Sequence, residues 1–156
     1  KLSQGINKMK IEKTFTVQAS QDEVWKFITS PEKVAPCIPG CEGAEQTGEN
    51  TYKASIKVKV GPIKTRFVVD IETIEERPPE FASYMTKGEE GTKSSRLKAS
   101  STLALIALED GGTEVTYTSE INLLGRLGKF GSGMMQKVAD SIGNEFVAGL
   151  KEQVEK

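Results

Sequence analysis

The chain has 156 residues, enough for one ordinary domain and too few for two. It carries 21 basic and 22 acidic residues, so its formal charge of −1 favours neither nucleic acid nor an anionic membrane. The sequence contains no histidine, which excludes Ser–His–Asp catalysis, Cys–His catalysis and histidine-ligated metal sites in this chain.

Two cysteines, Cys37 and Cys41, lie four residues apart in the segment Cys-Ile-Pro-Gly-Cys. A closed zinc site needs four ligands, and no further cysteine or histidine exists to complete one. We therefore expect two reduced thiols with a structural role in a packed turn, and a facultative disulfide is the alternative. No metal and no other cofactor are predicted.

No targeting or membrane-spanning segment is apparent. Residues 1–10 lack the apolar core of a secretory signal, and the longest apolar run, Leu103–Leu108, is far shorter than the roughly 20 residues of a spanning helix. These features predict a cytoplasmic protein. Met9 is a candidate natural start, so we interpret residues 1–8 as an arm, vector-derived or disordered, and residues 9–156 as a single domain.

The first predicted elements are a strand and two short helices. Alternating apolar and polar residues predict a strand over Met9–Val17. Ser20 and Glu23 form a capping box, which opens a short helix. Ser30-Pro31 repeats the start signal, because proline suits the first helical position, and Pro36 ends this second helix.

A run of strands and one long helix follow. Alternation and turn residues predict strands at 52–60, 63–72, 81–87, 95–108 and 113–122. From about Gly131 to Lys156 the apolar residues occupy half of a helical circle, so this stretch is one helix of roughly 38 Å. Strands segregated from helices indicate an α+β fold. We expect a curved antiparallel sheet of about seven strands wrapped around the long C-terminal helix.

Three segments of this chain carry a family resemblance: Glu23-Val24-Trp25, Ser30-Pro31-Glu32 and Cys37-Ile38-Pro39-Gly40-Cys41-Glu42. Together with the element order, they resemble the CoxG-like family, that of the carbon monoxide dehydrogenase G-subunit, within the START / Bet v 1-like (SRPBCC) superfamily. The resemblance covers essentially the whole chain from Met9. It implies a helix-grip fold with a cavity for an apolar ligand between the sheet and the long helix.

The resemblance also implies a role. CoxG-like proteins are associated with membrane attachment of molybdenum hydroxylases and with carriage of quinone to such enzymes. Some members have a C-terminal extension that reaches the membrane, whereas this chain stops at the helix. We therefore expect at most a peripheral contact with the inner face of the membrane.

Small residues on the inward face of the predicted sheet indicate the cavity. Ala54, Ala99, Ser101 and Ser119 share this face with bulky residues and leave room that a close-packed core would fill. A solid core, with bulky helix side chains over the small residues, is the alternative. The residues expected to bind the ligand are Trp25, Tyr52, Ala54, Ile56, Phe67, Val69, Tyr84, Leu97, Ala99, Ser101, Leu103, Tyr117, Leu127, Phe130, Met134, Met135, Val138 and Ile142.

The segment before the long helix is a candidate gate over this cavity. Flexible methionines and Phe130 adjoin glycines at positions 125, 128, 131 and 133, which suits a segment that opens and closes. Ordinary packing and ordinary turns are the alternative.

One predicted hairpin has a basic outer face, made of Lys53, Lys57, Lys59, Lys64 and Arg66. No aromatic residues interleave with these cations, so nucleic-acid binding is not expected. A solvated face is the simplest interpretation, and docking to an acidic partner or to lipid headgroups is the alternative.

Three hypotheses for function remain. The first is a non-catalytic carrier of an isoprenoid quinone or lipid, accessory to a molybdenum hydroxylase, with Tyr52, Tyr84, Tyr117 or Ser101 orienting the ligand's polar head. The second is a cyclase-like or hydrolase-like enzyme, which the absence of histidine and of paired carboxylates disfavours. The third is an assembly factor whose cavity is incidental.

Overall fold

The computed structural model describes residues 6–92, 94–127 and 132–155. The chain order of elements is β1 (Ile6–Val17), α1 (Gln21–Ile28), α2 (Pro31–Val34), the 3-10 turn η1 (Ala35–Cys37), β2 (Cys41–Gln46), β3 (Thr51–Val60), β4 (Ile63–Arg77), β5 (Phe81–Glu90), β6 (Ser95–Ala107), β7 (Thr113–Gly125) and α3 (Ser132–Val154). The seven strands pair antiparallel in the order β1-β7-β6-β5-β4-β3-β2. This arrangement confirms the predicted α+β helix-grip fold.

Several boundaries differ from those predicted. β1 begins at Ile6 and pairs there with Leu124, so residues 6–8 belong to the sheet and not to an arm. Pro36 does not end the second helical segment, because η1 continues it to Cys37. Strand β2 was missed because four of its six residues are exposed, as is common at the edge of a sheet, and alternation is therefore weak.

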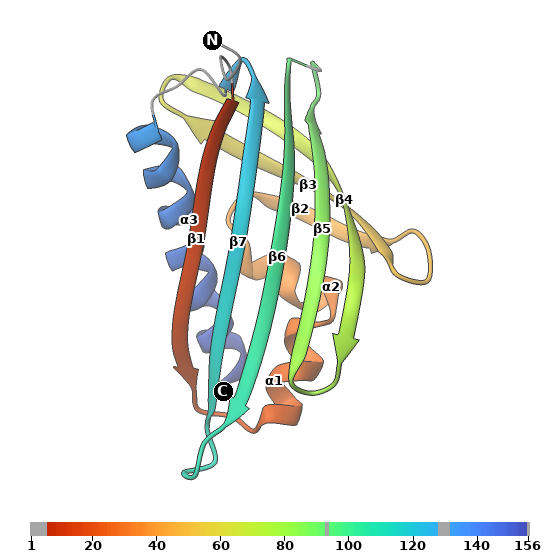
Figure 1. Ribbon diagram of the computed structural model, residues 1–156, viewed down its shortest axis with the longest axis vertical. Coiled ribbons are helices and arrows are strands. Elements are labelled where there is room, and N and C mark those ends of the chain that lie inside the picture. The colour runs from red at the N-terminus through yellow and green to blue at the C-terminus, as the bar shows by residue number, and fades with distance from the viewer. Residues whose placement is uncertain (1–5, 93, 128–131, 156) are drawn as a thin grey trace.

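Helix α3 lies along β1 at one side of the curled sheet, while β3 and β2 curve behind the front strands (Figure 1). Two glycines permit this close approach. A Cβ atom at Gly143 would lie 3.2–3.3 Å from side-chain atoms of Lys13 and Ile11, and one at Gly149 would lie 3.3 Å from Cys37. Both distances are tighter than ordinary van der Waals contact, so larger residues would push α3 away from β1 and η1.

The buried apolar residues form two clusters. One lies where β3, β4 and β7 meet the first turns of α3 and includes Val60, Phe67 and Leu127. The other lies under α1 and includes Val24 and Leu150. Tyr117 packs against both clusters.

A buried carboxylate holds the end of β7 in place. The Glu90 side chain is fully buried on β5, and its Oε2 accepts a hydrogen bond from the Arg126 guanidinium. The backbone N–H of Arg126 donates to the Ser94 carbonyl (2.8 Å), and the N–H of Leu127 donates to Ser95 Oγ (3.0 Å). These contacts attach the segment that leads toward α3 to the start of β6.

The charge of Glu90 depends on these partners. Burial raises the pKa of this carboxyl, but the nearby Thr65 and Ser95 hydroxyls and the Arg126 guanidinium lower it, and the pKa lies below its ordinary value. A carboxyl with a depressed folded-state pKa stabilises the fold above its unfolded-state pKa. That contribution is lost as the pH falls through the folded-state pKa.

We therefore expect Arg126→Met to lower the free energy of unfolding at pH 7 by about 2 kcal/mol, because it leaves Glu90 charged, buried and unpaired. The loss is smaller than for a fully buried pair, since the Arg126 side chain is 45% exposed. Urea unfolding at pH 7 and at about pH 3 measures it. The loss should shrink at the lower pH, where a protonated carboxyl needs no cation.

The matched control is Arg66→Met, which removes an exposed ion pair with Glu42 and should cost much less. An equal loss for Arg126→Met at both pH values would contradict the assignment of Glu90 as the charged partner.

Candidate functional site

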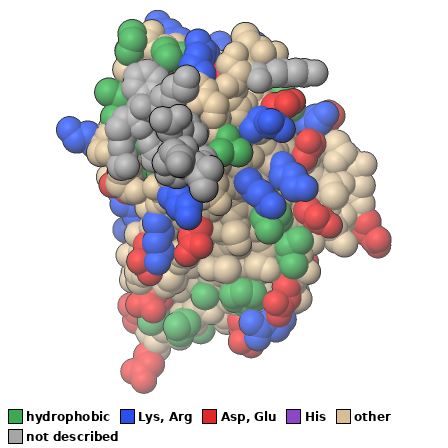
Figure 2. All heavy atoms as spheres, turned by 45° about the horizontal axis from the view of Figure 1, so that its top comes forward, with side chains coloured by type: hydrophobic (Ala, Val, Ile, Leu, Met, Phe, Trp, Pro, Cys, Tyr) green, Lys and Arg blue, Asp and Glu red, His purple; other side chains and the backbone are tan. Residues whose placement is uncertain are grey.

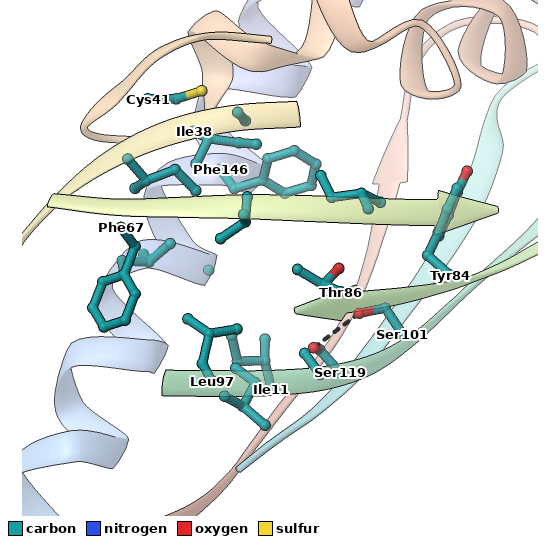
Figure 3. Close-up of a pocket in the computed structure, with 18 of the residues that line it drawn as sticks. Ile11, Ile38, Cys41, Phe67, Tyr84, Thr86, Leu97, Ser101, Ser119 and Phe146 are labelled. Atoms are coloured by element: carbon teal, nitrogen blue, oxygen red, sulfur yellow. Dashed lines mark hydrogen bonds between the residues drawn. The ribbon is translucent and has the colours of Figure 1, made fainter. Parts of the chain in front are cut away.

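A cavity of about 400 Å³ lies between the concave face of the sheet and the helices (Figure 3). All seven strands contribute to its wall, and α1, α2, η1 and α3 contribute from the other side. Its volume falls within the roughly 300–1,000 Å³ of ordinary small-molecule sites. A close-packed core has few voids larger than a water molecule. A cavity of this size therefore favours the open space predicted beside the small inward residues over a solid core in which bulky helix side chains cover them.

Fifteen of the eighteen residues expected to bind a ligand line this cavity. They are Tyr52, Ala54, Ile56, Phe67, Val69, Tyr84, Leu97, Ala99, Ser101, Leu103, Tyr117, Leu127, Met135, Val138 and Ile142. The sheet register brings together residues from strands that are distant in sequence. Their spacing along each strand places the strand residues among them on the concave face.

The other three predicted residues do not belong to the described lining. Trp25 is buried in the core cluster under α1, while Ile28 presents the part of that helix that reaches the cavity. Met134 is 41% exposed, because it lies about 100° around α3 from the buried Met135. Phe130 lies outside the described residues.

Sequence analysis missed the wall made by α2, η1 and the turn that follows. Pro31, Val34, Ala35 and Ile38 all line the cavity. Their spacing is i, i+3, i+4, i+7, which is the pattern of one apolar helical face and was a usable signal. The helix was predicted from its start and stop signals alone, and the residues after Pro36 were interpreted as a packed turn, so the apolar face that they share was not assigned to the site.

Hydroxyl groups interrupt the apolar wall. Ser101 Oγ and Ser119 Oγ lie 3.0 Å apart in a hydrogen bond, and both residues are buried (Figure 3). Thr73, Tyr84 and Thr86 also line the cavity. Burial raises the pKa of Tyr84 well above its ordinary value, and the nearby Glu76, Tyr52 and Tyr117 add to the shift. The Tyr84 phenol therefore stays protonated and can donate a hydrogen bond.

Charge is almost absent from the cavity. Among the described residues, the lining includes no lysine or arginine, and its charged member is the exposed Glu76. Within the same ranges, no group of three His, Cys, Asp or Glu side chains could hold a metal ion. None of the helices in the described ranges is both long and apolar enough to cross a membrane.

The two cysteines are free thiols in different surroundings. Cys37 is buried beneath α3, and burial together with the charge of Glu152 raises the pKa of its thiol. Cys41 lines the cavity and donates a weak hydrogen bond to the Gly43 carbonyl (3.6 Å). Cys41 is thus part of the site as well as of the turn.

The basic hairpin is partly neutralised. Glu42 on β2 contacts Arg66 at 2.7 Å and Lys57 at 3.4 Å, so two of the five cations have a carboxylate partner. Figure 2 shows acidic side chains beside lysines and arginines on the face it presents. A solvated, mixed-charge surface agrees with this pairing.

The candidate gate is described only in part. Gly125 and Gly133 are described, whereas positions 128–131 lie outside the described residues.

Solved structures share this architecture. A conserved protein from Geobacillus kaustophilus is similar at a TM-score of 0.84 and 24% identity, covering 93% of this chain and 94% of that one. A START superfamily protein from Mycobacterium smegmatis has a TM-score of 0.68 and 14% identity, covering 94% and 97%. The ZhuI aromatase/cyclase from Streptomyces sp. R1128 has a TM-score of 0.62 and 16% identity, covering 96% and 92%. These identities show the fold alone.

Family membership rests on a separate finding. No curated protein matches the chain. The model of the CoxG family, described as the G-subunit of carbon monoxide dehydrogenase, matches residues 14–155, which is nearly the whole length. The predicted resemblance is therefore confirmed, and family and fold together support a ligand-binding protein. The chain belongs to the carbon monoxide dehydrogenase G-subunit (CoxG) family.

Proposed function

We propose that this protein is a non-catalytic carrier that holds an isoprenoid quinone or a lipid in the cavity. The observation that supports this most directly is a cavity of about 400 Å³ with an almost uncharged, mainly apolar wall. Each 100 Å² of apolar ligand surface buried there contributes about 2.5 kcal/mol before the costs of association. Water alone would gain little from such a wall, because few polar partners are available to it.

The family suggests where the cargo goes. We propose that the protein is accessory to a carbon monoxide dehydrogenase-type molybdenum hydroxylase, since the family takes its description from that enzyme. Delivery would occur in the cytoplasm, with at most peripheral membrane contact.

Mass spectrometry of an organic extract of the purified protein tests the cargo, and recovery of no quinone or lipid would count against it. Delivery is tested by measuring how fast the hydroxylase reduces quinone when it is mixed with quinone-loaded protein and, separately, with protein from which the quinone has been extracted.

Substituting Ala99 tests the cavity directly. Ala99 lines the cavity on β6, so the ring of Ala99→Phe would occupy space that a ligand needs. We expect the melting temperature to change by only a few degrees and binding of the neutral fluorescent dye Nile red to fall at least tenfold. In a solid core the same change would overpack the site, at about 1–3 kcal/mol.

The control for this variant is Ser100→Phe, because Ser100 is the exposed neighbour on the same strand. It should retain dye binding. A large drop in melting temperature for Ala99→Phe, with dye binding unchanged, would show that no ligand space exists at this position. An assembly role with an incidental cavity predicts that Ala99→Phe still supports the hydroxylase.

Cys41 offers a reporter of occupancy. Its thiol lines the cavity, so saturating the protein with 2,3-dimethylnaphthalene should slow alkylation of Cys41 by iodoacetamide several-fold, as measured by mass spectrometry. Cys37 should react more slowly throughout, because it is buried and its pKa is raised. The Cys41→Ser variant lacks this thiol, so comparison with it shows which alkylated product comes from Cys41. Equal Cys41 rates with and without the hydrocarbon would place the bound molecule elsewhere.

The carrier proposal also predicts no turnover. The chain has no histidine, burial keeps the Tyr84 phenol protonated, and Glu76 is the only carboxylate on the described wall, where it is exposed, so the described wall offers no pair of carboxylates for acid–base chemistry. Quinones, esters and polyketides incubated with the protein should be recovered unchanged by chromatography. A product that appears with the natural sequence and disappears with Tyr84→Phe or Tyr117→Phe would favour the enzyme instead.

A further inference from the structure

We propose that a row of hydroxyls across the sheet is the polar subsite of the cavity. This hydroxyl row consists of Thr73, Tyr84, Ser101 and Ser119, and it selects uncharged ligands whose polar end accepts hydrogen bonds, such as a ring carbonyl. The inference rests on the proposed carrier function. It adds the class of ligand and the direction in which the ligand lies.

The strand register builds the row. Thr73 on β4 pairs with Tyr84 on β5, Tyr84 pairs with Ser101 on β6, and Ser101 pairs with Ser119 on β7. Directly opposed side chains on one face of a sheet have Cβ atoms about 5 Å apart. Four consecutive strands therefore place hydroxyl-bearing residues side by side, and all four residues line the cavity.

The serine pair leaves one hydrogen free for a ligand. Ser101 Oγ and Ser119 Oγ lie 3.0 Å apart, with 6% and 2% of the residues exposed. Each hydroxyl has one hydrogen, and a single bond between the two oxygens uses only one of the two hydrogens. The second is available to an acceptor in the cavity. Tyr84, which stays protonated, is a further donor in the same row.

The described part of the wall disfavours anionic head groups. It contains no lysine or arginine, so a carboxylate or phosphate buried there would have no counter-ion among the described lining residues. Burying an unpaired charge is far more costly than burying a neutral carbonyl that accepts a hydrogen bond. A neutral quinone or ketone matches the wall, whereas a fatty acid or phospholipid head does not.

The opposite end of the cavity suits a hydrocarbon tail. Val60, Phe67, Leu123, Leu127 and Met135 line it near the first turns of α3 and belong to one core cluster. In Figure 3, Phe67 and Leu97 lie toward one end of the cavity, and Tyr84 lies beyond Ser101 toward the other. The ligand's polar end therefore points toward Thr73 on β4 and Tyr84 on β5. Its apolar part points toward the start of α3.

Two probes with the same ring skeleton test the subsite. They are 2,3-dimethyl-1,4-naphthoquinone and 2,3-dimethylnaphthalene, and their affinities are measured by displacement of Nile red. Both reactive ring positions of the quinone are substituted, so the Cys41 thiol has no free position to which it can add. We expect the double variant Ser101→Ala/Ser119→Ala to weaken quinone binding roughly three- to tenfold, the value of one hydrogen bond. Hydrocarbon binding should stay within twofold.

Three comparisons complete the experiment. Ser100→Ala, at the exposed neighbour on the same strand, should change neither affinity. Tyr84→Phe should also weaken only the quinone, and it provides a second variant if the double variant melts early. The anionic probe 3-methyl-2-naphthoate should bind the natural protein at least tenfold more weakly than the quinone does.

Equal loss of both neutral probes in the serine and Tyr84 variants would overturn the subsite, because the row would then be structural. If the natural protein binds the hydrocarbon and the variants bind the quinone as tightly as the natural protein does, the subsite is overturned. The carrier function would remain in place. If the natural protein binds neither neutral probe, the carrier function fails and the subsite fails with it.

Discussion

The close contact of α3 with β1 and η1 is the constraint on which the site depends. Gly143 and Gly149 allow the helix backbone to approach Ile11 and Cys37, so α3 lies at one side of the curled sheet. The cavity-facing side chains of α3, such as Val138 and Ile142, form one wall and leave a cavity between the helix and the sheet. The inward residues there include small and hydroxylic ones, such as Ala99 and Ser119, and the volume between them stays open. A cavity results because neither layer supplies enough side-chain volume.

The distribution of polar groups follows from the same arrangement. Charges are held at the margins, where partners or water reach them: Glu90 pairs with Arg126 at the end of β7, and Glu42 pairs with Arg66 at the sheet edge. On the described wall of the cavity, the polar side chains are hydroxyls and a thiol, apart from the exposed Glu76. Hydroxyls can satisfy one another, as Ser101 and Ser119 do, so each of these two buried groups has a partner within the protein.

Sequence patterns were reliable wherever a residue's burial depends on its own element. Alternation located five strands after the helices, and helical periodicity located α3 within a few residues. The errors have one common cause. Strand β2 and residues 6–8 form pairs at an edge or near a terminus, where only the partner strand shows that a segment is extended. Trp25 was expected in the site and lies instead in the core cluster with Val24, because which core a side chain enters depends on how α1 packs.

The sequence by itself determined the fold class and the inward face of each strand that it located, because period-two and period-3.6 patterns are local properties of the chain. Three short segments, together with the order of elements, indicated the family. The sequence also showed that no histidine chemistry is available. Only the tertiary structure decided that Thr73, Tyr84, Ser101 and Ser119 form one row, because strand register joins positions that lie up to 46 residues apart. It likewise decided that α2 and η1 close the cavity, since a helix face has no partner until the chain has folded over the sheet.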